Sequence, residues 1–319
     1  MMNLLLLLAG FIILIKGADF LVAGASSIAK KYGISNLAIG LTVVAFGTSM
    51  PELIVSLLAA INGQNDASFG NVIGSNNFNL LFILGLAGTI YPLVVQKSTV
   101  KFEIPISLLA AGILFFLVND KLIGNENINS LGRIDSVVLL LFFVAFMGYV
   151  YKTMKNSTDE DTGTNAKMYG MLTAIGMVIL GLGMLIGGGK LVVDSAIDIA
   201  HYFGLSEKLV GLTILAAGTS LPELATSAVA AFKRNTDIAI GNVIGSNIFN
   251  IFFILGTTGL ISPIPFNTEL NFDIYVLLGS TIVLMIFMFT LNRAKLDRWE
   301  AVMLLGAYIT YTAYLISVD

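Results

Sequence analysis

The chain has 319 residues, of which 56% are hydrophobic and only 12% are charged. Soluble globular domains carry about 25% charged residues, so this composition excludes a soluble protein and indicates an integral membrane protein. The net charge of −3, with basic residues in short loops, gives no sign of a nucleic-acid partner, and the absence of cysteine excludes disulfides and thiolate metal sites.

Apolar runs of about 17 to 25 residues, the length that crosses a bilayer as a helix, define the expected spans. We predict ten, at roughly 2–28, 36–61, 68–95, 104–118, 134–152, 168–201, 207–232, 238–262, 273–291 and 299–317. A hydrophilic linker at 154–166 separates them into two sets of five. The predicted fold class is therefore an all-α integral membrane protein with ten transmembrane helices.

Lysine and arginine are distributed unevenly over the predicted loops. One side of the membrane has twelve: Lys30, Lys31, Lys97, Lys101, Lys152, Lys155, Lys167, Lys233, Arg234, Arg293, Lys295 and Arg298. The other side has three, Lys121, Arg133 and Lys208. Because cytoplasmic loops carry the excess of these residues, we predict a multi-pass protein of the cell membrane with a cytoplasmic linker and both termini outside.

Two motifs occur twice at a constant separation of 171 residues. Gly-Thr-Ser-Met-Pro-Glu at 47–52 returns as Gly-Thr-Ser-Leu-Pro-Glu at 218–223, and Gly-Asn-Val-Ile-Gly-Ser-Asn at 70–76 returns at 241–247. Five spans per copy is an odd number, so the second copy must be inverted relative to the first. Inverted repeats are typical of transporters, whose site lies at the repeat interface near the bilayer midplane.

The predicted organisation follows from this duplication. It comprises a first five-helix repeat at 1–153 with motif regions 40–56 and 70–79, the linker at 154–166, and a second repeat at 167–319 with motif regions 211–227 and 241–250.

The first motif combines a proline with a glutamate at membrane depth. Pro51 and Pro222 each remove a backbone donor, so we expect the helix to break around 45–49 and 216–220 and to free carbonyl groups for a site. A carboxylate at this depth costs about 2.5 to 3.5 kcal/mol on insertion scales, and a bound cation would offset that cost. The duplication argues against a purely structural role for Glu52 and Glu223.

The second motif supplies neutral oxygen ligands. Ser75 and Asn79 are separated by four residues and share one helix face, as do Ser246 and Asn250. Hydrogen bonding between helices is the alternative role for these four side chains. Asp66 and Asp237 are expected to cap the helices that carry them.

An all-oxygen ligand set selects among metal ions. Ca²⁺ takes about 6 to 8 oxygen ligands in a forgiving geometry, whereas Mg²⁺ requires a strict octahedron. Neutral hydroxyl and amide oxygens beside two glutamates would also suit Na⁺. Soft transition metals are disfavoured, since the chain has no cysteine and its one histidine, His201, falls near a membrane boundary.

The duplicated motifs resemble the α-repeats of the cation/calcium exchanger superfamily, in its ten-span prokaryotic sodium/calcium exchanger form. The resemblance covers nearly the whole chain. It implies a secondary antiporter that exchanges Na⁺ for Ca²⁺ by alternating access, without enzyme activity, cofactor or obligate protein partner, and with the first and sixth spans sliding across the other eight. By matching position we assign cation-ligand roles to Glu52, Glu223, Thr48, Thr219, Ser49, Ser220, Ser75, Ser246, Asn79 and Asn250, and to the carbonyls of Ala45 and Ala216.

Two comparisons within the superfamily bear on the coupling ion. Some relatives have aspartate at the position of Asn250, so asparagine here indicates potassium independence and leaves two central carboxylates. The proton/calcium branch usually has glutamate where this chain reads Ser-Asn at 75–76 and 246–247, so H⁺/Ca²⁺ antiport is the alternative. A passive cation channel is a further alternative, which the inverted repeat argues against.

Overall fold

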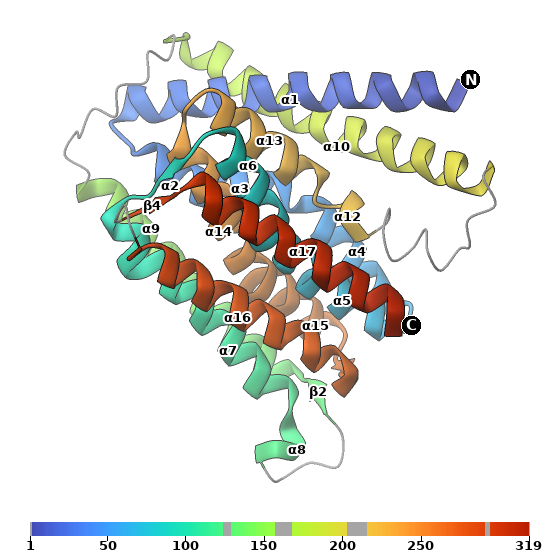
Figure 1. Ribbon diagram of the computed structural model, residues 1–319. Helices are drawn as coiled ribbons and strands as arrows, with labels where there is room; N and C mark the ends of the chain where they lie inside the picture. The colour runs from blue at the N-terminus through green and yellow to red at the C-terminus, as the bar shows by residue number, and fades with distance from the viewer. Residues whose placement is uncertain (1, 124–128, 157–167, 203–215, 291–293, 319) are drawn as a thin grey trace.

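The computed structural model describes residues 2–123, 129–156, 168–202, 216–290 and 294–318, most of which are helical (Figure 1). The helices before the linker are α1 (Met2–Tyr32), α2 (Asn36–Ile39), η1 (Gly40–Val44), α3 (Ala45–Thr48), α4 (Met50–Ile61), α5 (Asn65–Asn77), η2 (Phe78–Ile83), α6 (Leu84–Ile90), η3 (Thr99–Glu103), α7 (Ile104–Val118), α8 (Asp120–Ile123) and α9 (Arg133–Asn156). Those after it are α10 (Met171–Tyr202), α12 (Ala216–Gly218), α13 (Leu221–Phe232), α14 (Thr236–Ile248), η5 (Phe249–Leu255), α15 (Gly256–Ile261), η6 (Thr268–Leu270), α16 (Asn271–Phe287) and α17 (Arg298–Val318).

Eight helices in the described part of the chain are long and apolar enough to cross a membrane. A ninth span is formed if the pair Asn36–Thr48 and Met50–Ile61, bent by 45°, is counted as one. The predicted seventh span, 207–232, lies partly outside the described residues, and its described part includes the twelve-residue apolar helix α13. The protein is therefore a multi-pass helical membrane protein, and the count of ten stays a prediction.

The predicted fourth span is too short. The helix starts at Thr99 and runs to Val118, because the π-helical segment η3 continues directly into α7. Lys101 and Glu103 interrupt the apolar run in the sequence, but both lie within the helix. Glu103 is buried there, and its Oε1 accepts a hydrogen bond from Tyr149 at 2.5 Å.

Helices α1 and α10 lie side by side as an antiparallel pair along one side of the molecule (Figure 1). Glycines make the close approach possible: a Cβ atom on Gly181 would lie 2.7 Å from the backbone nitrogen of Leu21 and 2.8 Å from the carbonyl oxygen of Gly17. Small residues are the usual means of bringing two membrane helices into backbone contact. The pair thus forms one closely packed unit.

The helices that carry the second motif occupy the centre of the molecule. In the most apolar stretch of 18 residues, 94% of the residues are buried in Thr236–Ile261 and 72% in Asn65–Ile90, but only 17 to 33% in the other six spans. In both, a π-helical segment (η2 or η5) follows the motif. Such segments are rare and are frequent at functional sites.

The predicted aspartate caps are wrong. The N-cap residues of α5 and α14 are Gln64 and Asn235, and the Asn235 side chain accepts from the backbone N–H of Ile238. Each helix begins before its aspartate, so Asp66 and Asp237 lie in the first turn, where a negative charge is still favourable.

Two short antiparallel ribbons join chain segments far apart in sequence. Strand β1 (Leu93–Val94) pairs with β4 (Lys295–Leu296), and β2 (Ser130–Leu131) pairs with β3 (Ile264–Pro265). Each ribbon therefore ties a segment before the linker to one after it.

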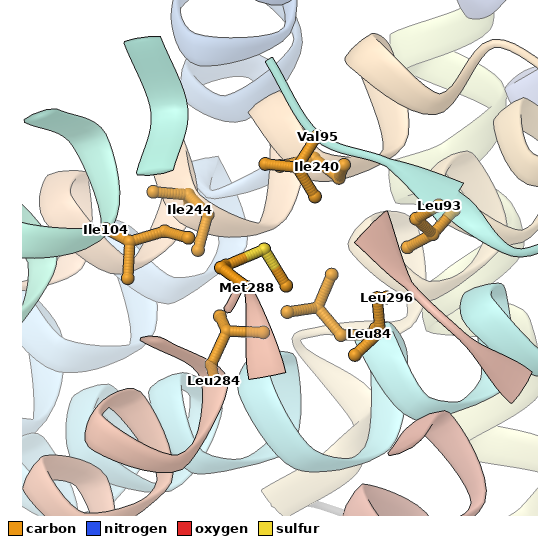
Figure 2. A pocket seen from close by; sticks show the side chains of 9 residues that line it. All are labelled: Leu84, Leu93, Val95, Ile104, Ile240, Ile244, Leu284, Met288 and Leu296. Carbon is orange, nitrogen blue, oxygen red and sulfur yellow. The ribbon is translucent and has the colours of Figure 1, made fainter. Parts of the chain in front are cut away.

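A small pocket lies where α14 meets α6, α7, α16 and the β1–β4 ribbon, and nine apolar side chains line it (Figure 2). They are Leu84, Leu93, Val95, Ile104, Ile240, Ile244, Leu284, Met288 and Leu296. The lining side chains offer no oxygen to a cation, so this pocket is not a candidate ion site.

Candidate cation-binding site

The prolines of the first motif break their helices as predicted. The backbone leaves the helical conformation at Ser49 (φ −85°, ψ 8°) and at Ser220 (φ −88°, ψ 9°), and α4 and α13 begin at the next residue. Proline fits here because the first N–H groups of a helix have no intrahelical acceptor. The break puts Glu52 and Glu223 in the first turn of their helices, where the positive end of the helix dipole favours a carboxylate.

The two motifs meet through serine–glutamate hydrogen bonds that cross between them. Ser49 Oγ donates to Glu223 Oε1 at 2.8 Å, and Ser220 Oγ donates to Glu52 Oε1 at 2.9 Å. Both glutamates are fully buried, with 0% and 1% of their surface exposed. Residues 171 positions apart in the sequence thus form one site.

Two asparagines that sequence reasoning missed support this arrangement. Asn71 Nδ2 donates to the Glu52 carbonyl oxygen at 3.2 Å, and Asn242 Nδ2 donates to the Glu223 carbonyl oxygen at 3.3 Å. Each also links to the opposite motif, because Thr219 Oγ1 donates to Asn71 Oδ1 at 3.2 Å and Thr48 Oγ1 lies 3.1 Å from Asn242 Oδ1. Their position in the duplicated second motif was the signal that could have identified them.

Five side-chain oxygens of the predicted ligands are buried without a hydrogen-bond partner among the described residues. They are Glu52 Oε2, Glu223 Oε2, Ser75 Oγ, Asn79 Oδ1 and Asn250 Oδ1. An unsatisfied buried polar group costs about 1 to 3 kcal/mol, and more if it is charged. A cation that accepts electron pairs from these oxygens would remove that cost.

Ser246 and Ser75 differ although they occupy matching positions. Ser246 Oγ lies 3.0 Å from Ser49 Oγ and 3.5 Å from Glu223 Oε1, so it is already part of the crossed hydrogen bonds. Ser75 Oγ finds no such partner in the described part of the chain. The arrangement of the site is therefore not fully symmetric.

The two alanines predicted to contribute carbonyl ligands begin short helices. Ala45 is the first residue of α3, and its carbonyl oxygen lies 3.0 Å from Ser49 N and 3.3 Å from Thr48 Oγ1. Ala216 is the first residue of α12. Both stand one turn before the helix break, and their ligand roles stay predictions.

The chemistry of the donor set is that of a hard cation. Within the described ranges, no group of three or more His, Cys, Asp or Glu side chains could form a metal cluster. Two carboxylates surrounded by hydroxyl and amide oxygens instead match the preference of Ca²⁺ and similar ions for oxygen. A buried set of oxygen donors at the interface of duplicated motifs in a helical membrane protein is typical of ion transporters.

Comparisons with known proteins agree with this class and specify it. The chain belongs to the sodium/calcium exchanger protein family, whose model matches residues 2–152 and 173–317. As a member of that family it is a cation/Ca²⁺ exchanger and an antiporter.

Individual relatives match over nearly their full length. A putative antiporter, CaxA of Alkalimonas amylolytica, is 37% identical, with 97% of each chain covered. The sodium/calcium exchanger MaX1 of Methanosarcina acetivorans is 32% identical, with 98% of each covered. Among solved structures, the sodium-calcium exchanger NCX_Mj superposes with a TM-score of 0.81 at 34% identity, covering 98% of both chains.

Proposed function

We propose that the protein exchanges Na⁺ for Ca²⁺ across the cell membrane by alternating access. The observation that carries this proposal is the pair of crossed, buried glutamates, each with one unpartnered carboxylate oxygen among the described residues. Two carboxylates can neutralise one Ca²⁺ or assist several Na⁺ ions. Because one small site cannot hold both sets at once, each ion has to leave before the other is transported.

The proposed ligands are the twelve residues assigned from the sequence. They are Glu52, Glu223, Thr48, Thr219, Ser49, Ser220, Ser75, Ser246, Asn79 and Asn250 through their side chains, and Ala45 and Ala216 through their carbonyls. Support is strongest for the residues that combine burial with an unpartnered oxygen.

The proposed architecture is two inverted five-helix repeats, 1–153 and 167–319, joined by a cytoplasmic linker. The hydrogen bonds in the site support it, since each crossed contact has a counterpart with the roles of the two motifs exchanged. The two ribbons show the same correspondence. In each, a strand that follows a second-motif helix (β1 or β3) pairs with a strand that precedes the last helix of the other half (β4 or β2).

Ion flux into proteoliposomes tests the exchange. Vesicles loaded with Na⁺ and diluted into Na⁺-free buffer should accumulate ⁴⁵Ca²⁺ much faster than vesicles loaded with choline, with the membrane potential held constant in both. Equal uptake in the two preparations would reject Na⁺ coupling. Uptake driven by a pH gradient without Na⁺ would indicate the proton antiporter, and flux that needs no counter-ion would indicate a channel.

Cysteine labelling tests the orientation, and the cysteine-free sequence makes the background clean. Asn62 and Lys31 are both exposed, at the ends of α4 and α1. An Asn62→Cys variant should react with a membrane-impermeant maleimide in intact cells, whereas Lys31→Cys should react only after permeabilisation. The reverse pattern would overturn the proposed topology.

A further inference from the structure

Four asparagines at the centre of the molecule form a connected set of amide groups: Asn76, Asn79, Asn247 and Asn250. The set is here called the amide ring, because Asn76 and Asn247 bond to each other reciprocally, and Asn79 and Asn250 are attached to that pair. Two of them join the halves of the chain directly. Asn76 Nδ2 donates to the carbonyl oxygen of Asn247 at 3.2 Å, and Asn247 Nδ2 donates to the carbonyl oxygen of Asn76 at 3.2 Å. All four side chains are buried.

The other two members of the ring are candidate ion ligands. Asn79 Nδ2 donates to Asn247 Oδ1 at 3.0 Å, and Asn250 Nδ2 donates to Asn76 Oδ1 at 2.9 Å. The nitrogen end of each candidate ligand is therefore engaged by the ring. The oxygen ends, Asn79 Oδ1 and Asn250 Oδ1, have no partner among the described residues.

This arrangement addresses a problem that every amide ligand faces. The two ends of a side-chain amide are similar in shape, but only the oxygen attracts a cation and the NH₂ group repels it. In the amide ring, a backbone carbonyl, which cannot reverse its polarity, orients Asn76 and Asn247. Each of these then offers only an oxygen to the next amide, so Asn250 and Asn79 have to turn their nitrogens toward the ring.

We propose that Asn76 and Asn247 are positioning residues that hold the amide oxygens of Asn250 and Asn79 toward the transported cation. The inference rests on the proposed function, because it assigns no ion site of its own. It also accounts for asparagine at position 250: an ionised aspartate there would bring a carboxylate oxygen against Asn76 Oδ1, an acceptor facing an acceptor.

The first test measures ion binding without transport. The purified protein is heated at increasing Ca²⁺ concentrations, and the concentration that gives a fixed rise in Tm, which scales with the dissociation constant, is recorded. Asn76→Ala should raise that concentration by roughly 10- to 100-fold, the usual cost of losing a group that orients a metal ligand. Asn77→Ala is the matched control, because Asn77 is equally buried and donates to the Asp273 carbonyl oxygen at 3.0 Å, but its side chain forms no hydrogen bond with the amide ring in the described part of the chain.

The second test separates orientation from packing. A carboxylate presents oxygen at both ends, so in an Asn250→Asp background the loss of Asn76 should cost little Ca²⁺ affinity. A packing role for Asn76 would instead give the same loss in both backgrounds, since independent effects add. If Asn76→Ala lowers the yield of folded protein, Asn247→Ala with Asn79→Asp provides the same cycle in the other half.

The possible outcomes are distinct. Equal Ca²⁺ affinities for Asn76→Ala and Asn77→Ala, or additive losses in the double variant, would overturn the positioning role while leaving the exchanger intact. A wild-type protein that neither Ca²⁺ nor Na⁺ stabilises, and that shows no Na⁺-driven uptake, would remove the proposed function and this inference with it.

Discussion

Replacing Glu52 or Glu223 by glutamine is expected to reduce Ca²⁺ uptake driven by a Na⁺ gradient by more than about 100-fold. Removing one partner of a buried charge interaction costs roughly 3 to 5 kcal/mol, and each 1.4 kcal/mol is about tenfold in binding. Glutamine keeps the shape of the side chain and its contact with the serine of the opposite motif, so the variants should fold. Without ions, they should be at least as stable as the wild type, because a neutral amide costs less to bury than a carboxylate.

Glu103→Gln is the control for this pair of variants. Glu103 is also a fully buried glutamate within a span, with Oε2 unpartnered in the described part of the chain, but it contacts Tyr149 and lies outside the crossed serine–glutamate pairs. Its replacement should leave ⁴⁵Ca²⁺ flux close to the wild-type value. Near-normal flux in Glu52→Gln or Glu223→Gln would contradict the assignment of the ligands.

A substitution at the contact between α14 and the broken first-motif helix is expected to have the second large effect, a loss of stability. A Cβ atom on Gly241 would lie 2.8 Å from the Leu37 carbonyl oxygen and 3.1 Å from Gly40 Cα, both of which are backbone atoms that cannot rotate away. Gly241→Ala should therefore destabilise the protein by about 1 to 3 kcal/mol, the usual cost of overpacking. It should also slow exchange, because a displaced η1 would shift α3, which follows it directly, and would separate Thr48 of α3 from Asn242.

Thermal unfolding of the purified protein measures this effect, and Gly112→Ala is the control. Gly112 lies in the middle of α7, where a Cβ atom would meet no described atom within 4 Å apart from the backbone of its own helix and its chain neighbours. Alanine is the better helix former, so this variant should be as stable as the wild type or slightly more stable. Equal unfolding temperatures for the two variants would contradict the role of Gly241 in the close contact between α14 and the first-motif helix.

Much of the candidate site could be predicted from the sequence because its motifs combine residue types that are rarely found together in a membrane span. A glutamate after a proline in an apolar run is costly, and its recurrence at an offset of 171 residues leaves few explanations besides a ligand. The break at Ser49 and Ser220 also followed from local chemistry alone, since proline removes one N–H wherever it occurs.

The predictions that were wrong share a physical cause. Whether a polar residue lies inside a helix or at its end depends on partners from elsewhere in the fold, which the local sequence does not show. Lys101 and Glu103 interrupted the apparent fourth span in the sequence. In the structure, Tyr149 from another helix donates a hydrogen bond to the buried Glu103, so this residue lies within the span. The caps of α5 and α14 were assigned to aspartates that lie in the first turn, and a difference of one or two residues in a helix start is not visible in a hydropathy pattern.

By itself, the sequence determined the class of the protein, the duplicated motifs and the kind of ligand atoms, because these depend on composition and on spacing along one chain. The tertiary structure alone decided which atoms meet. Ser49 could not be paired with Glu223, nor Asn250 with Asn76, from their positions in the sequence, because these contacts cross between the halves of the chain. Hydrogen bonds act over about 3 Å, and only the packing of helices from the two halves against one another brings those groups within that distance.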